Sequence, residues 1–248
     1  MNNPDAAERL IAKLATRSDI DTNDCAAIRA LPFTKRTVEA PAYLVREGEK
    51  SRAHCTLILS GFAMRQKLAM SGARQIVSFH LAGDFIDLQQ MMLSVADHNV
   101  QALTRMTVAD VTRAALQDLS RLRPNIARAM WIDGLVDASI YREWVLNVGR
   151  RDARAKIAHV LCEFGVRMKA AGIAHEGGYE LPMTQEQLGD AVGLTAVHVN
   201  RTLKALVADG VVSIERRQVR VRNWDRLMAA GDFSALYLHL DQVPAAAR

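Results

Sequence analysis

The chain has 248 residues, of which 50% are apolar and 24% are charged. This length and composition are typical of a globular protein with room for two hydrophobic cores. No apolar run approaches the roughly 20 residues of a transmembrane helix, and the first residues lack a signal-peptide pattern. Three widely spaced cysteines exclude a disulfide framework and a CxxC metal site, so we expect a protein of the reducing cytoplasm. The net charge is +5, and residues 149–222 hold 12 Lys and Arg against 8 Asp and Glu, which favours an anionic partner.

The first half of the chain is predicted to be a short helix followed by strands. The helix lies in MNNPDAAERLIAKL, with Asn3 as its cap and Pro4 in its first turn. Short apolar runs such as TLILS, QIVSF and VADVT then fill residues 33–115. They are separated by glycines at intervals of 11 to 13 residues, namely Gly48, Gly61, Gly72 and Gly83. Regular turn signals at this spacing predict an all-β sandwich or barrel.

A long helix is predicted from Pro124 to Val148. One seam recurs at the four-then-three spacing of paired helices, and its candidate dimer contacts are Trp131, Gly134, Ala138, Tyr141, Val145 and Val148. A second apolar stripe contains Ile126, Met130, Ile140 and Trp144. Two stripes indicate a helix that packs on its own domain and also meets a second helix. The alternative is a helix buried inside one large domain.

The segment VGRRD at 148–152 predicts a charged domain boundary. An amphipathic helix is expected over 157–168, and a polar, Gly-rich loop over 171–182. Thr184 with Gln187 forms a predicted capping box at the start of a short helix. Gly193 suits a sharp turn with positive φ, and Thr195 caps the next helix. Two alternating strands, VVSIE and QVRVR, follow. Helix, tight turn, helix and basic hairpin together predict a winged helix-turn-helix.

The second helix of this motif, in LTAVHVNRTLKAL, has two different faces. Its apolar stripe is formed by Val199, Leu203 and Leu206. Arg can form two hydrogen bonds to guanine and Asn can form two to adenine, so the opposite face can read base edges in a major groove. Lys204 and the arginines of the hairpin suit contacts to phosphates. The candidate DNA-binding residues are Thr184, Thr195, His198, Asn200, Arg201, Lys204, Arg216 and Arg217.

The chain resembles the CRP/FNR superfamily of bacterial transcription regulators over roughly residues 30–223. The resemblance rests on REGEKSRAHCTLILSGFAMR, on HLAGDFIDL and above all on MTQEQLGDAVGLTAVHVNRTLKALVADGVV. It implies an α+β fold with a β-roll (jelly roll) like a cyclic-nucleotide-binding domain at residues 1–123, together with the N-terminal helix. A dimerisation helix follows at 124–148 and a winged helix-turn-helix domain at 149–248. The implied partners are a second copy in a homodimer, double-stranded DNA with a pseudo-palindromic site, RNA polymerase and a small effector.

The recognition helix both matches the family pattern and departs from it. Arg201 matches the arginine that reads guanine in the family. Ala196 and Val197 stand where the cyclic-AMP-responsive members carry two polar readers, and they cannot copy those contacts. His198 and Asn200 are therefore the candidates for an altered readout.

The sensor segment departs further from the cyclic-nucleotide binders. Asp87 and Leu88 stand where those proteins have a Gly-Glu pair, and Asn99 and Val100 replace the Arg-Ser/Thr that holds the phosphate. A cyclic phosphate would meet no cation there and would lie near an extra carboxylate, so binding of cyclic AMP is not expected. Three scattered cysteines cannot supply an iron–sulfur cluster. The effector and any cofactor stay unidentified.

The histidines and cysteines are interpreted as ordinary surface or core residues. His54, His80 and His98 have no metal-ligand spacing, so we expect no metal site. Cys162 lies on an apolar helix face and is interpreted as inert core. A redox-sensing role for Cys55 is the weaker alternative to a place in the core.

Two further classes of function are alternatives to a transcription regulator. The chain could be a ligand- or partner-binding β-roll module whose helix-turn-helix no longer reads DNA. Such a loss predicts acidic or apolar residues on the outer face, and Asn200, Arg201 and Lys204 are neither. The chain contains no P-loop, no GxGxxG opening a helix, no HExxH and no GxSxG, so we do not expect an enzyme.

Overall fold

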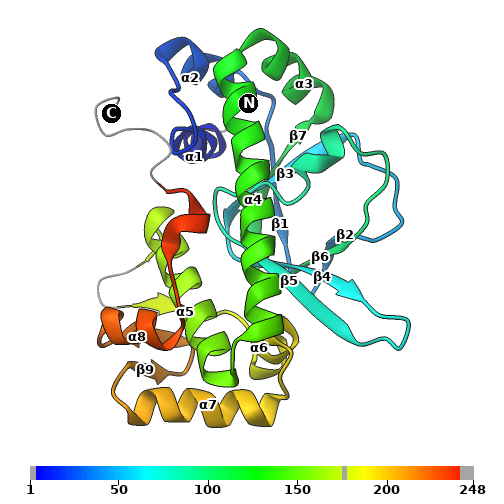
Figure 1. The fold of residues 1–248 in the computed structure, drawn as a ribbon. Coiled ribbons are helices and arrows are strands. Elements are labelled where there is room, and N and C mark those ends of the chain that lie inside the picture. Colours follow the sequence, from blue (N-terminus) through cyan, green and yellow to red (C-terminus); the bar gives the residue numbers. More distant parts are fainter. Residues whose placement is uncertain (1–3, 175–177, 241–248) are drawn as a thin grey trace. The chain divides into compact units, whose positions relative to one another are not determined.

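A computed structural model describes residues 4–174 and 178–240 (Figure 1). They form two compact units. The first unit contains residues 4–66, 79–138 and 239–240. The second contains residues 67–78, 139–174 and 178–238. Among the helices described, none combines the length and the apolar character needed to cross a membrane.

The first unit begins with α1 (Pro4–Leu14) and α2 (Thr22–Arg29). The predicted N-terminal helix is thus confirmed from Pro4 onward, while its expected cap Asn3 lies outside the described residues. Ion pairs hold α1 in place. The Lys13 ammonium lies 2.7 Å from Asp84, and the Arg17 guanidinium lies 2.9 Å from Asp133.

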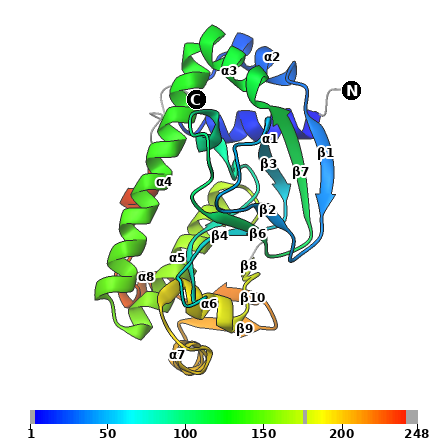
Figure 2. The ribbon, with the colours of Figure 1, turned by 90° about the vertical axis from the view of Figure 1, so that its right-hand side faces the viewer.

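Seven strands form two sheets, as the strand-like texture predicted (Figure 2). One sheet has the order β1-β7-β3 and the other the order β2-β6-β4-β5. The four spaced glycines all adopt φ between 84° and 98°, as their turn roles require. A Cβ on Gly61 would lie 2.5 Å from the Arg105 carbonyl oxygen, so this turn also needs glycine for space. The strands are β1 (Thr34–Val38), β2 (Tyr43–Val45), β3 (His54–Ser60), β4 (Ala63–Leu68), β5 (Arg74–His80), β6 (Asn99–Ala102) and β7 (Met106–Thr112), with a 3-10 turn η1 (Leu88–Met91) before β6.

Two helices follow the β-roll, α3 (Arg113–Leu122) and the long α4 (Pro124–Arg150). The second apolar stripe of α4 is buried, as expected for the side that packs on its own chain; it contains Ile126, Met130, Ile140 and Trp144. The first half of α4 belongs to the first unit and the second half to the second unit.

The second unit contains α5 (Ala153–Ala170), α6 (Gln185–Val192), α7 (Ala196–Ala208) and α8 (Trp224–Ala230). Its small sheet has the order β8-β10-β9, formed by β8 (Tyr179–Glu180), β9 (Val212–Glu215) and β10 (Gln218–Val221), and a 3-10 turn η2 (Ala235–Leu238) follows α8. The prediction of a plain loop over 171–182 is wrong at its end. Tyr179 pairs with Val219 of β10 and is buried there.

The start of this unit differs from the sequence-based expectation at two points. The helix α4 continues into the charged segment 148–152 and ends at Arg150, and the Arg151 side chain is only 6% exposed. Arg151 lies 2.7 Å from Glu143 and 3.2 Å from Asp232. The helix α5 is not amphipathic in its middle, since every residue from 157 to 165 is buried. It packs against α6, α7 and α8, which leaves no solvent face for that stretch.

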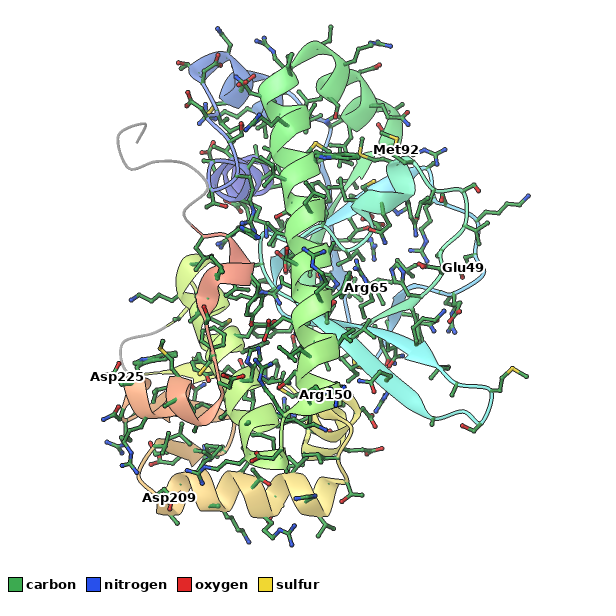
Figure 3. The ribbon with its side chains drawn as sticks, in the orientation of Figure 1. Glu49, Arg65, Met92, Arg150, Asp209 and Asp225 are labelled. Carbon is green, nitrogen blue, oxygen red and sulfur yellow. The ribbon has the colours of Figure 1, made fainter. Side chains whose placement is uncertain are left out.

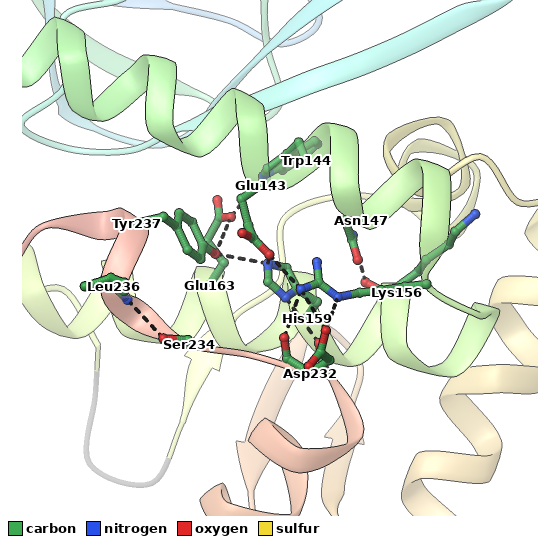
Figure 4. Close-up of polar contacts among 12 residues, drawn as sticks. Glu143, Trp144, Asn147, Lys156, His159, Glu163, Asp232, Ser234, Leu236 and Tyr237 are labelled. Carbon is green, nitrogen blue, oxygen red and sulfur yellow. Dashed lines mark hydrogen bonds and ion pairs between the residues drawn. The ribbon is translucent and has the colours of Figure 1, made fainter.

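A buried polar cluster explains how α5 carries charged groups inside (Figure 4). The Glu163 carboxylate accepts hydrogen bonds from the Trp144 indole (2.9 Å) and from the Tyr237 hydroxyl (2.9 Å). The His159 ring lies between that hydroxyl (3.1 Å) and the Gly231 carbonyl oxygen (3.2 Å). Buried polar groups need such partners. The residues after α8 therefore complete the core around α5.

Candidate nucleic-acid interface

The helix-turn-helix is built by short-range hydrogen bonds that the sequence predicted. Thr184 accepts from the Gln187 amide (3.1 Å), and the Gln187 side chain accepts from the Thr184 amide (2.8 Å). Gly193 follows α6 with φ 68° and ψ 42°, in the left-handed region. Thr195 then caps α7 by accepting from the His198 amide (3.3 Å). The candidate contacts Thr184 and Thr195 thus lie at the exposed starts of the two helices.

The two helices meet through apolar side chains. Leu188 and Val192 of α6 are buried, as are Val199, Leu203 and Leu206 of α7, in agreement with the predicted inner stripe. Sequence reasoning missed Gly189. A Cβ at that position would lie 2.3 Å from the Leu194 carbonyl oxygen, so only glycine allows the turn to approach α6. Its one signal was a glycine inside an otherwise regular helix pattern.

The four candidate DNA contacts on the outer face of α7 fall into two pairs. Arg201 and Lys204 are exposed, whereas His198 and Asn200 are half-buried. The Asn200 amide donates to the Gln185 side chain of α6 (3.1 Å). A pairing of Asn200 with adenine would therefore have to replace or share this contact. Lys204 is exposed and can contact a phosphate.

A groove runs between the start of α5 and α7. His198 and Arg201 line it from α7, and Asp152 and Arg154 line it from α5. The Arg154 guanidinium lies 2.7 Å from Asp209, just after α7. The groove is thus lined by charges of both signs, and Arg201 is its exposed cation on the recognition helix.

The β9–β10 hairpin carries the basic wing. Arg216 and Arg217 are exposed at its tip, where Arg216 has φ 57°. This left-handed conformation is unusual for a residue with a Cβ. Arg220 in β10 and Arg222 just after it are also exposed, and they were missing from the sequence-based candidates. The alternation in QVRVR was the signal that could have found them, because it sets both arginines on one side of the strand.

Comparisons with known proteins agree with this geometry. The family model of the Crp-like helix-turn-helix domain matches residues 155–230, and that of the cyclic nucleotide-binding domain matches residues 35–122. Transcriptional activator protein FnrL of Cereibacter sphaeroides is 28% identical over 219 residues, which are 86% of this chain and 87% of that protein. The fumarate and nitrate reduction regulatory protein of Salmonella typhimurium is 23% identical over 197 residues, which are 79% of this chain and 77% of that protein. The solved structure of FixK2 from Bradyrhizobium japonicum matches with a TM-score of 0.75 at 27% identity, and the match covers 83% of this chain and 100% of that chain.

The chain belongs to the CRP/FNR superfamily. It is a DNA-binding transcription regulator with a β-roll of the cyclic-nucleotide-binding type and a winged helix-turn-helix, as its sequence predicted.

The CRP/FNR regulator carries its candidate dimer seam on the uncovered side of α4. Trp131 is 70% exposed, Val145 is 75% exposed and Gly134 is also exposed. Ala138, Tyr141 and Val148 are half-buried. Leu135 and Leu146 add to this apolar surface, although sequence reasoning did not assign them to it. Large apolar side chains gathered along one helix are typical of a surface that meets a partner.

In the β-roll of this CRP/FNR regulator, the residues that stand where cyclic-nucleotide binders hold the nucleotide contact their own chain. The Asn99 side chain accepts from the Glu47 amide (3.1 Å). Asp87 is fully buried, and its Oδ1 accepts from the Thr56 amide (2.8 Å). Its Oδ2 has no hydrogen-bond partner within the part of the chain that the structure describes. Burial raises the pKa of Asp87 to about 7, although the hydrogen bond from Thr56 opposes the shift.

Arg65 is the buried cation of the same β-roll (Figure 3). Its Nη2 donates to the Ile86 carbonyl oxygen (3.0 Å), and its Nη1 lies 3.8 Å from Asp137. The guanidinium is thus bound to the protein itself, and Asp87 adds a carboxyl group nearby. The residues present do not fit the phosphate of a cyclic nucleotide.

The remaining reactive side chains lie apart from one another. His54 lies 3.8 Å from Asp110, His80 lies 3.9 Å from Asp84 and His98 lies 2.6 Å from Asp97. Over residues 4–174 and 178–240, no group of three or more His, Cys, Asp or Glu side chains could hold a metal ion. Cys55 and Cys162 are fully buried, and burial raises the pKa of each thiol to about 12. A buried thiol with this pKa is a poor redox sensor.

Proposed function

We propose that this regulator binds a pseudo-palindromic DNA site as a homodimer, with Arg201 reading a guanine in each half-site. The observation that carries the proposal is the outer face of α7. Arg201 and Lys204 are exposed there, and the wing adds Arg216 and Arg217. In a two-fold dimer, two such helices would enter major grooves about one helical turn apart.

The base-reading role of Arg201 is tested against a phosphate-binding role. We expect Arg201→Ala to weaken binding by about 1–3 kcal/mol per half-site and to relax the preference at one base pair. Arg217→Ala is the matched control, because it removes the same charge from the wing. It should weaken binding to all sequences alike and lower the salt dependence by about one unit.

The measurement is a binding series at several salt concentrations on a selected site, on its single-base variants and on random DNA. An equal loss on every sequence for Arg201→Ala would reduce Arg201 to a phosphate anchor. Absence of any site preference in the wild-type protein would contradict base readout by this helix.

The homodimer is proposed to form along the exposed seam of α4. Gly134 and Gly149 give a matched pair of variants, because an added Cβ meets nothing within 4 Å at either position in the single chain. Both changes to alanine improve helix propensity by about 1 kcal/mol. Only Gly134 belongs to the proposed seam, so Gly134→Ala should weaken the dimer, whereas Gly149→Ala should leave it intact.

Sedimentation equilibrium measures the dimer dissociation constant of both variants. A second variant, Tyr141→Asp, should give monomers at micromolar concentration because it places a charge in the seam. A wild-type monomer under these conditions would contradict the dimer. Equal dissociation constants for the two glycine variants would remove Gly134 from the interface.

We also propose that neither cyclic AMP nor cyclic GMP is the effector. The support is the lack of fit described above. Asn99 and Val100 stand where the nucleotide binders carry Arg-Ser/Thr. The buried Arg65 guanidinium donates to the Ile86 carbonyl oxygen and lies 3.8 Å from Asp137. Calorimetric titration of the full chain should give no binding in the micromolar range. Micromolar binding of either nucleotide would contradict the proposal.

Activation through RNA polymerase is proposed from the relatives. FnrL is named a transcriptional activator. Transcription in vitro with purified bacterial RNA polymerase tests the proposal on a promoter that carries the selected site upstream. We expect more transcript with the protein present, and Arg201→Ala should remove the effect. A decrease in transcript would show a repressor.

A further inference from the structure

Val197 is an exposed apolar residue in the first turn of the recognition helix. Its side chain is 81% exposed, while the other valine of that turn, Val199, is fully buried. Single exposed apolar residues are ordinary on protein surfaces. Val197 differs from such residues in its position, because the N-terminal residues of a recognition helix are those that contact base edges.

Val197 shares a helix face with Arg201. Residues four apart in an α-helix are neighbours on its surface and lie about 6 Å apart along the axis. Stacked base pairs are about 3.4 Å apart. If Arg201 binds a guanine, Val197 therefore reaches a base that lies within about two base pairs of it.

The polar residues near Val197 are less available for that base. The Asn200 amide is bound to Gln185, and His198 is half-buried in the groove beside α5. Ala196 is exposed but has a single methyl group. Val197 is thus the larger exposed side chain at the start of the helix. The apolar feature of base edges in the major groove is the C5-methyl group of thymine.

We propose that Val197 contacts the C5-methyl group of a thymine within two base pairs of the guanine read by Arg201. The inference rests on the proposed binding of DNA by α7 and assigns a specificity-determining residue to it. An apolar contact of this kind favours binding to thymine, because it buries the methyl group, and it gives no hydrogen bond to cytosine or adenine at the same position.

Replacement of thymine by deoxyuridine tests the contact, because it removes only the methyl group. The experiment measures binding of the full chain to its selected site and to copies with deoxyuridine at one thymine position of both half-sites. Loss of one buried methyl contact should weaken wild-type binding by about fourfold per half-site at the position read by Val197.

The variant Val197→Ala should bind the thymine and deoxyuridine copies with equal affinity. Val207→Ala is the matched control, because Val207 is also an exposed valine of α7 but lies near its C-terminal end. That variant should keep the wild-type penalty for deoxyuridine.

The outcomes separate the inference from the function on which it rests. If wild-type protein shows no deoxyuridine penalty at any thymine near the guanine, the inference is wrong. It is also wrong if Val197→Ala keeps the full penalty, because another residue then contacts the methyl group. In both cases the guanine preference lost in Arg201→Ala would still support DNA reading by α7. If Arg201→Ala also kept the guanine preference, the proposed base readout by α7 would itself be wrong.

Discussion

Replacement of Asp87 by asparagine should stabilise the β-roll, and it should do so more at high pH. The Asp87 carboxyl group is fully buried, with one oxygen bound to the Thr56 amide and the other without a hydrogen-bond partner among the described residues. Asparagine keeps an oxygen that can accept from Thr56, and it never carries a charge. The variant therefore removes the cost of ionising a buried acid.

The size of the effect follows from the pKa of Asp87, which burial raises from 3.8 to about 7. Because the pKa is raised in the folded protein, the contribution of Asp87 to stability is fully present below pH 3.8. It is lost as the pH rises toward 7. Each pKa unit corresponds to about 1.36 kcal/mol, so the loss is about 4 kcal/mol at pH 8. At pH 5.5 it is about 2 kcal/mol, so the advantage of Asp87→Asn should grow by about 2 kcal/mol between these pH values.

Urea unfolding at pH 5.5 and at pH 8 measures this difference, and hydrogen exchange of the β3 amides assigns it to the β-roll. Asp19→Asn is the control, because Asp19 is an exposed carboxylate of the same unit. It should leave the pH dependence of the wild type unchanged. An advantage of Asp87→Asn that is the same at both pH values would refute the reasoning, since it would mean that the carboxyl group does not titrate in this range.

Three further changes test the second unit. Gly231→Ala should lower its stability by about 1–3 kcal/mol in thermal unfolding, because the new Cβ would lie 2.7 Å from the His159 backbone nitrogen; an unchanged melting temperature would contradict this close approach. Burial, helped by the charge of Arg151, lowers the pKa of His159 below its usual 6.5. The stability that the neutral His159 contributes is thus complete above about pH 6.5 and is lost as the pH falls. His159→Gln should therefore reduce the loss of melting temperature between pH 7.5 and pH 5.5. An equal loss in both proteins would contradict this role of His159. Arg216→Gly should raise stability by about 1 kcal/mol, because it relieves a φ of 57°, and should still weaken binding to all DNA sequences. Higher affinity of that variant on a DNA-binding isotherm would contradict a phosphate contact.

The sequence by itself determined the features that depend on neighbours a few residues away. The capping box of Thr184 and Gln187 joins residues three apart, and the left-handed turn at Gly193 is a property of that residue and its helix. The inner stripe of α7 follows from helical periodicity alone, and the alternation in QVRVR predicted a strand. These interactions form in the same way whatever lies elsewhere in the chain. For this reason the helix-turn-helix could be placed, with its caps and its outer face, before any tertiary contact was known.

Only the tertiary structure decided which polar side chains are buried and which candidate base-reading residues are hydrogen-bonded within the protein. The helix expected to be amphipathic over 157–168 contains His159 and Glu163, yet both are buried because Tyr237, more than 70 residues later, supplies their partner. Asn200 looked available for adenine, but Gln185 on the neighbouring helix holds its amide, while Val197 is left exposed. Spacing along the chain encodes no distance between such residues. Burial and hydrogen bonding depend on which segments pack together, and that packing exists only in the folded chain.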